Sequence, residues 1–145
     1  MCGIAGFYGQ NDPTLLGVMS GKIAHRGPDD SGEFYDENQK IGLVHRRLSI
    51  IDLSAGGHQP MIDPQTSTVI VFNGEIYNYK ELSTRLERKG HRFNTNSDTE
   101  VLLKMYLEYG EKAVKYLIGI FAFAIWDPHK KILMLGRDGA GVKPL

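Results

Sequence analysis

Short apolar or alternating runs, bounded by Gly, Pro, Asn and Asp, occur throughout this sequence. Runs of this kind are typical of β-strands, and a continuous apolar run indicates a strand buried on both faces. The last two lie on either side of Asp127-Pro128 and are predicted to form a hairpin. The strands are expected over residues 2–8, 33–35, 41–45, 68–72, 119–126 and 131–136.

Three other stretches repeat their apolar positions at helical spacing. The first follows Asp12-Pro13, an N-cap residue with proline at the first helical position, and should run to about His25 because Gly27-Pro28 stops it. The other two open with a capping-box signature and end at a glycine. These signatures are Asn78 with Glu81 before Gly90, and Ser97 with Glu100 before Gly110. Helices and strands are therefore mixed, as in an α+β fold.

Two segments carry neither pattern. Residues 54–65 are rich in Gly and Pro and are predicted to form a long loop, and such loops in compact domains are usually functional or mobile. Residues 137–145 follow the last strand without a closing element, which would leave a sheet edge unpaired. We therefore expect a truncated domain that continues beyond Leu145.

Composition indicates one ordinary globular unit, with 145 residues, 41% hydrophobic residues, and 17 Lys+Arg against 17 Asp+Glu. The dispersed, balanced charge offers no basic footprint for nucleic acid or an anionic membrane. The longest mainly apolar run, residues 118–126, is far shorter than the roughly 20 residues that span a bilayer. The N-terminus lacks the basic region of a secretory signal, so a cytoplasmic location is expected.

Several kinds of site are excluded by the sequence. One cysteine cannot form an internal disulfide or a multi-cysteine metal site, and the five histidines are scattered, so no metal site is expected. Neither a phosphate-binding loop of the G-x-x-x-x-G-K-[ST] type nor a G-x-G-x-x-G helix start is present. We expect no cofactor in this chain.

The single cysteine, Cys2, directly follows the initiator Met1. Removal of Met1 would place the thiol on the terminal residue, where the free α-amino group, with a pKa of about 7.7–8.0, could accept the thiol proton. The alternative is that Cys2 is a small buried hydrophobic residue. A papain-like pairing with His45 or His58 is also open, although the surrounding sequence lacks that family's pattern.

Asn73-Gly74 directly follows a predicted strand. A side-chain amide beside a glycine N–H is a sensible pair of donors for an oxyanion. Asn-Gly is also the commonest two-residue hairpin turn, but the next segment is predicted to be a helix and not a returning strand. Both interpretations stay open at this point.

Two charged residues could complement a free amino acid. Arg47 ends a predicted strand and could grip a carboxylate with both guanidinium nitrogens, although solvent-exposed arginines are the simpler alternative. Asp98 would lie in the first turn of a helix, where a carboxylate is favoured in any case. An Arg and an Asp in one pocket would match an α-carboxylate and an α-ammonium group.

Five short motifs follow one another along the chain. They are CGIAG at residues 2–6, HRGPD at 25–29, RLSIID at 47–52, NGEIYN at 73–78 and SDTE at 97–100. In this order they closely resemble the glutaminase domain of glutamine-hydrolysing asparagine synthetases, which are class II glutamine amidotransferases, and the resemblance covers essentially the whole chain. It implies an N-terminal-nucleophile hydrolase fold, a four-layer αββα sandwich with two mostly antiparallel sheets between helical layers.

The resemblance also implies roles for individual residues. Cys2 matches the nucleophile that attacks the side-chain amide of glutamine, and Asn73 and Gly74 match the oxyanion hole. Arg47 matches the residue that grips the α-carboxylate of the substrate. Glu75 and Asp98 match positions around its α-amino group. The segment of Leu48, Ser49, Ile50 and Ile51 also matches the substrate pocket, which the backbone of Ile50 and Ile51 lines.

The activity implied by the resemblance has two halves. Residues 1–145 would release glutamate and ammonia from glutamine. The ammonia would pass to the protein's own C-terminal synthetase domain, expected after residue 145, which uses ATP and Mg²⁺ to convert aspartate to asparagine. Glutamine and that domain are the expected partners, with a homodimer left open.

Three alternatives remain at this stage. Glucosamine-6-phosphate synthase and the amidophosphoribosyltransferase of purine synthesis share the terminal cysteine and the Asn-Gly pair, but residues 25–29 and 46–50 look like the asparagine synthetase version. Bacterial relatives that amidate surface sugars are similar in this domain. A non-catalytic module of the same fold is the third alternative.

Overall fold

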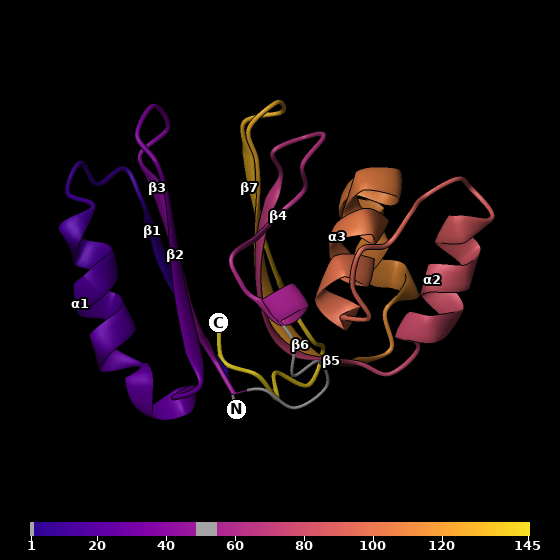
Figure 1. Cartoon of the computed structure of the whole chain (residues 1–145), viewed down its shortest axis with the longest axis horizontal. Coiled ribbons are helices and arrows are strands. Elements are labelled where there is room, and N and C mark those ends of the chain that lie inside the picture. Colours follow the sequence, from indigo (N-terminus) through magenta and orange to yellow (C-terminus); the bar gives the residue numbers. More distant parts are fainter. Residues whose placement is uncertain (1, 49–54) are drawn as a thin grey trace.

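In a computed structural model of the chain, which describes residues 2–48 and 55–145, two antiparallel sheets lie face to face with helices outside them (Figure 1). The first sheet has the order β1-β3-β2, formed by Gly3–Tyr8, Ile41–Arg47 and Asp30–Asp36. The second has the order β4-β5-β6-β7, formed by Met61–Ile62, Val69–Ile76, Gly119–Asp127 and Ile132–Arg137. The helices are α1 at Thr14–Lys22, α2 at Tyr79–Glu87 and α3 at Asp98–Tyr109, with 3-10 turns at Ala24–Arg26, Ala55–Gly57 and Gly110–Tyr116.

These elements form four layers. Helix α1 lies outside the first sheet, and α2 and α3 lie outside the second (Figure 1). The predicted αββα sandwich is therefore confirmed. So is the hairpin across Asp127-Pro128, since β6 and β7 are antiparallel neighbours.

Alternation along β5 explains why its sheet is buried on both faces. Val69 and Val71 point into the apolar cluster between the two sheets, whereas Ile70, Phe72 and Ile76 point into the cluster under α2 and α3. Successive strand side chains point to opposite faces, so one apolar run supplies two cores. By the same rule, the side chain of residue 73 faces the first sheet.

The inner face of β3 changes from apolar to polar toward its end. Ile41 and Leu43 belong to the cluster between the sheets, and the next residues on that face are His45 and Arg47. Both are buried. Because every second side chain of a strand points to the same face, His45 and Arg47 enter the space between the sheets, at one end of the sandwich.

Two predicted helix starts differ from the structure in their details. Helix α1 begins one residue later than predicted, at Thr14, whose backbone N–H donates to the Asp12 carboxylate. The prediction of a capping box at Asn78 is wrong, because this side chain donates to Tyr116 O and accepts from Ile118 N instead. Its amide therefore fixes the chain that leads into β6.

The third helix start is partly as predicted. Ser97 Oγ accepts a hydrogen bond from Thr99 N and so caps α3. Glu100 does not return to Ser97, because its carboxylate accepts from Asn94 N and Thr95 N instead. The acidic residue of the signature thus orders the loop before the helix.

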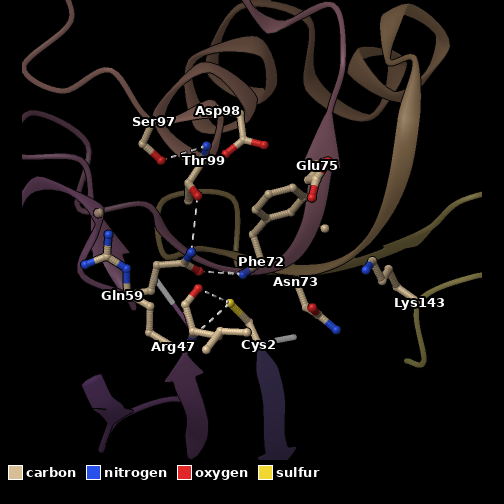
Figure 2. Close-up of a pocket in the computed structure, with 13 residues that line it drawn as sticks. Cys2, Arg47, Gln59, Phe72, Asn73, Glu75, Ser97, Asp98, Thr99 and Lys143 are labelled. Carbon is tan, nitrogen blue, oxygen red and sulfur yellow. Dashed lines mark hydrogen bonds between the residues drawn. The ribbon is translucent and has the colours of Figure 1, made fainter. Parts of the chain in front are cut away.

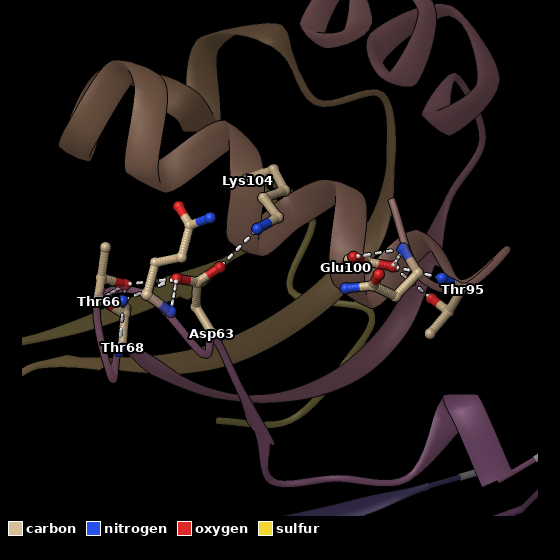
Figure 3. A network of polar contacts seen from close by, with 8 residues as sticks. Asp63, Thr66, Thr68, Thr95, Glu100 and Lys104 are labelled. Atoms are coloured by element: carbon tan, nitrogen blue, oxygen red, sulfur yellow. Dashed lines mark hydrogen bonds and ion pairs between the residues drawn. The ribbon is translucent and has the colours of Figure 1, made fainter. Parts of the chain in front are cut away.

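The predicted long loop is anchored to α3 by a buried ion pair. Lys104 Nζ lies 2.5 Å from Asp63 Oδ2, and Asp63 Oδ1 accepts from Gln65 N, Thr66 N and Thr66 Oγ1 (Figure 3). Burial disfavours the Asp63 carboxylate, but these bonds outweigh it and lower its pKa. The loop also contributes the short strand β4, which the sequence did not predict.

In the described ranges, 2–48 and 55–145, none of the helices has the length and apolar character needed to cross a bilayer. No group of three or more His, Cys, Asp or Glu side chains in those ranges could hold a metal ion.

Candidate active site

Cys2 lies directly before β1, at the end of the sandwich where β3 finishes. Its Sγ accepts from Leu48 N at 3.4 Å and donates to Leu48 O at 3.6 Å. Arg26 Nε donates to Cys2 O at 3.0 Å. The thiol is half-buried and borders a cavity of about 100 Å³ (Figure 2).

Neither His45 nor His58 bonds the Cys2 thiol in the described structure. The His58 ring bonds Asp30 at 2.7 Å, and His45 Nε2 lies 3.1 Å from Phe72 O. Burial lowers the pKa of His45 to about 4, so its ring is neutral at physiological pH. A papain-like pairing with Cys2 therefore has no support in the structure.

The opposite wall of the cavity is the end of β5, and its backbone donors are arranged in a row. Phe72 N donates to Gln59 Oε1 at 2.7 Å, and Ile76 N donates to Asp98 Oδ2 at 3.0 Å. Both N–H groups point away from β6. Because strand N–H groups alternate in direction, Gly74 N–H points the same way, between the other two.

The pairing with β6 supports this direction for Gly74. In the register, Gly74 lies opposite Phe121. Phe121 uses both its N–H and its C=O for Asp138, on the side away from β5. Residues directly opposite each other in an antiparallel pair either exchange both hydrogen bonds or neither. Gly74 N–H is therefore directed toward the cavity that this residue lines.

Asn73 and Gly74 lie inside β5 and not in a turn, because the strand continues to Ile76. The hairpin interpretation of Asn-Gly is thus excluded. The Asn73 side chain is buried on the face turned toward the first sheet, where Cys2 lies, and lines the same cavity. A Cβ on Gly74 would overlap the Ile120 carbonyl, so this position requires glycine.

Arg47 enters the cavity from the inner face of β3, with its guanidinium against Gly57. A Cβ on Gly57 would overlap that guanidinium. Asp30 lies opposite Arg47 in the β2–β3 register. Burial disfavours the Asp30 carboxylate, but the His58 hydrogen bond and the charges of His58 and Arg47 together lower its pKa.

Asp98, the first residue of α3, is buried and lines the same cavity as Arg47 (Figure 2). Burial raises the pKa of its carboxyl, although backbone N–H groups, including that of Ile76, favour the ionised form. Glu75 also lines the cavity and its charge adds to the upward shift. A bound cation would relieve the repulsion between these carboxylates.

The structure brings most of the predicted site residues into one cavity. Those lining it are Cys2, Arg47, Leu48, Asn73, Gly74, Glu75 and Asp98. Ser49, Ile50 and Ile51 lie outside the described residues.

Sequence reasoning missed other residues that line the cavity. They are Gly57, Gln59, Phe72, Ser97, Thr99 and Lys143. Gln59 and Gly57 come from the long loop, for which the sequence predicted a functional or mobile segment but no particular site residue. No spacing or charge pattern distinguishes them.

The cavity combines complementary chemistry. It offers a thiol, two amide side chains, two hydroxyls, a strand N–H pointing inward, one guanidinium, one ammonium group and two carboxylates. A guanidinium and carboxylates complement the two charged groups of an α-amino acid. A thiol opposite N–H donors suits acyl transfer through a tetrahedral intermediate.

Comparison with known proteins agrees with this chemistry. A family model described as glutamine amidotransferase domain matches residues 1–145. Glutamine-hydrolysing asparagine synthetases 1 and 2 of Bacillus subtilis are 47% and 44% identical over all of this chain, which covers 24% and 20% of their lengths. Amidase chry2 of Gibberella zeae is 38% identical, also over the whole chain and 24% of its own length.

Solved structures show the same fold. The glutamine phosphoribosylpyrophosphate amidotransferase of Bacillus subtilis, complexed with ADP and GMP, gives a TM-score of 0.73 at 23% identity, over 99% of this chain and 38% of that one. A structure of the allosteric regulatory enzyme of purine biosynthesis gives 0.78 at 20% identity, with the same coverage. The chain spans about a quarter of the length of the curated relatives it matches.

Proposed function

Because the chain belongs to the glutamine amidotransferase domain family, we propose that it hydrolyses the side-chain amide of glutamine through a thioester on Cys2. The observation that carries the proposal is the row of β5 donors. Phe72 N–H and Ile76 N–H are held by side chains, whereas Gly74 N–H points into the cavity that Cys2 borders.

The first half-reaction forms the thioester. Once Met1 is removed, the Cys2 α-amino group takes the thiol proton, and the sulfur attacks the amide carbon of glutamine. Gly74 N–H and the Asn73 amide donate to the oxygen of the tetrahedral intermediate. The carbon–nitrogen bond then breaks, and the α-ammonium group returns its proton to the leaving ammonia.

The second half-reaction releases glutamate. Water attacks the thioester carbonyl while the same amine accepts its proton, and the same two donors hold the oxyanion. The carbon–sulfur bond breaks, and the α-ammonium group returns its proton to the sulfur, which restores the thiol and the free amine. One difficult hydrolysis is thereby divided into two easier steps.

Substrate orientation comes from the charged walls of the cavity. Arg47 holds the α-carboxylate of glutamine, and Asp98 with Glu75 holds its α-ammonium group. Leu48, which also lines the cavity, completes the proposed substrate pocket. These contacts place the side-chain amide next to Cys2.

The ammonia acceptor is a separate proposal. The relatives named as asparagine synthetases are about four to five times as long as the chain, so we propose that ammonia passes to a synthetase domain that amidates aspartate. ATP and Mg²⁺ would serve that domain. A surface sugar or sugar phosphate is the alternative acceptor.

The test combines intact mass with glutamate release from glutamine. Loss of one Met with turnover supports the proposal, and Cys2→Ala should abolish turnover while glutamine still binds by calorimetry. Equal turnover by Cys2→Ala and the parent would overturn the assignment of the nucleophile. Formation of asparagine from aspartate, ATP and glutamine identifies the acceptor.

A further inference from the structure

We propose that Gln59 is a positioning residue for the oxyanion donors, because it fixes the end of β5 and ties it to α3. Gln59 does not touch the reacting atoms in this role. The inference rests on the proposed glutamine hydrolysis and names the device that keeps Gly74 N–H aimed at the cavity.

Strand β5 loses one of its two neighbours, β4, just before the cavity, whereas β6 stays paired with it. Strand β4 pairs with β5 through Met61 opposite Ile70 and Ile62 opposite Val69. If that register continued, residue 59 would lie opposite Phe72. The described pairing stops before that point, so the outward N–H and C=O of Phe72 need other partners.

Two buried side chains take the place of the missing strand. Gln59, 5% exposed, accepts from Phe72 N at 2.7 Å, and His45, 0% exposed, bonds Phe72 O at 3.1 Å. The Phe72 carbonyl is an acceptor only, so His45 Nε2 carries the proton. The two peptide groups that flank Phe72, directly before Asn73, are therefore each held by a side chain.

The other end of the Gln59 amide reaches the helix that carries Asp98. Gln59 Nε2 donates to Thr99 Oγ1 at 3.1 Å, and Thr99 is 3% exposed (Figure 2). The N-terminus of α3 thus holds β5 at two points, at Phe72 through Gln59 and at Ile76 through Asp98. Gly74 lies midway between these two points.

This arrangement matters because oxyanion donors act only within a narrow distance range, about 2.7–3.1 Å from the developing charge. A glutamine amide suits the task, since its oxygen accepts from a backbone N–H while its nitrogen donates to a hydroxyl. Loss of this bridge, the hydrogen bonds of Gln59 to Phe72 and Thr99, would let β5 move relative to Cys2. The expected defect therefore concerns the transition state more than substrate binding.

Two variants test the bridge. Gln59→Met removes both hydrogen bonds at similar side-chain length, and Thr99→Val removes only the second one at similar shape. We expect kcat to fall about tenfold for Thr99→Val and by a larger factor for Gln59→Met. Both losses should be smaller than the roughly 100-fold or greater loss typical when an oxyanion donor itself is removed. Affinity for glutamate should change less than twofold.

A transition-state readout separates positioning from general damage. The Cys2 thiol adds across the C=O bond of the γ-aldehyde analogue of glutamine. The oxygen of this adduct lies where the oxyanion develops. Its affinity should fall by the same factor as kcat. Thr68→Val is the matched control, since Thr68 is a buried threonine with a side-chain hydrogen bond to Thr66 and does not line the cavity.

The outcomes distinguish the two proposals. If the parent is active and Gln59→Met keeps its kcat and its affinity for the aldehyde, Gln59 is not a positioning residue. If the parent with free Cys2 releases no glutamate, the proposed function fails, and hydrogen exchange of the Phe72 amide then decides on the bridge. Faster exchange at Phe72 in Gln59→Met, without global unfolding, supports the bridge, and unchanged exchange overturns it.

Discussion

Replacing His45 by Gln should reduce the acid sensitivity of the fold. The His45 ring lies between the two sheets, and burial lowers its pKa from 6.5 to about 4. Nearby charges act in both directions, since Asp30 raises this pKa and Arg47 and His58 lower it. A glutamine amide can still donate to Phe72 O but does not titrate between pH 5 and 7.

The magnitude follows from proton linkage. The unfolded chain binds a proton at His45 near pH 6.5, whereas the folded chain does so only near pH 4. The histidine thus contributes stability above pH 6.5 that is lost as the pH falls toward 4. Between pH 7 and pH 5 this loss amounts to about 2 kcal/mol.

Urea denaturation at pH 7 and pH 5 measures the effect. For an m-value of about 1–3 kcal/mol/M, the parent midpoint should drop by about 1 M urea more than that of His45→Gln. Carboxyl groups affect both proteins alike and cancel in the difference. Equal drops in the two proteins would refute the argument that His45 is held neutral by burial.

Three further substitutions test the site and its support. Gly57→Ala should raise KM for glutamine about tenfold or more with the fold intact, because its Cβ would displace the Arg47 guanidinium; an unchanged KM would contradict the proposed carboxylate contact. Gly74→Ala should lower the melting temperature by about 4 °C or more, because its Cβ would overlap a β6 carbonyl, and a native-like melting curve would argue against this close approach. Lys104→Met should cost about 3 kcal/mol in urea denaturation, because the Asp63 carboxylate is left buried, whereas Asp63→Asn with Lys104→Met should recover part of this loss.

The sequence predicted most of the strands and helices well because their signals are local, whereas the four layers were implied by the family resemblance. Each apolar run, such as residues 69–72, needs only its own period to be recognised as a buried strand. Ser97 was also predicted correctly as a cap, since its bond to Thr99 spans two residues. Structure within one helical turn or one strand depends on residues that are close together in the sequence, so it can be predicted from them.

Features that depend on distant partners were not predictable in the same way. Asn78 looks like a helix cap, yet its amide bonds Tyr116 and Ile118, about 40 residues away. Gln59 carries no pattern of its own, and its importance depends on Phe72 and Thr99. The bare residue types at the site were visible, but the groups that aim them were not.

The cavity is closed by contacts between segments that are far apart in the chain. The Cys2–Leu48 bond spans 46 residues and the Gln59–Thr99 bond spans 40. High contact order of this kind slows folding, because loop-closure entropy must be lost before the contacts form. The nucleophile, its donors and its anchors therefore come together only when these distant segments pack against one another. The proposed glutaminase activity should therefore appear and vanish together with cooperative folding.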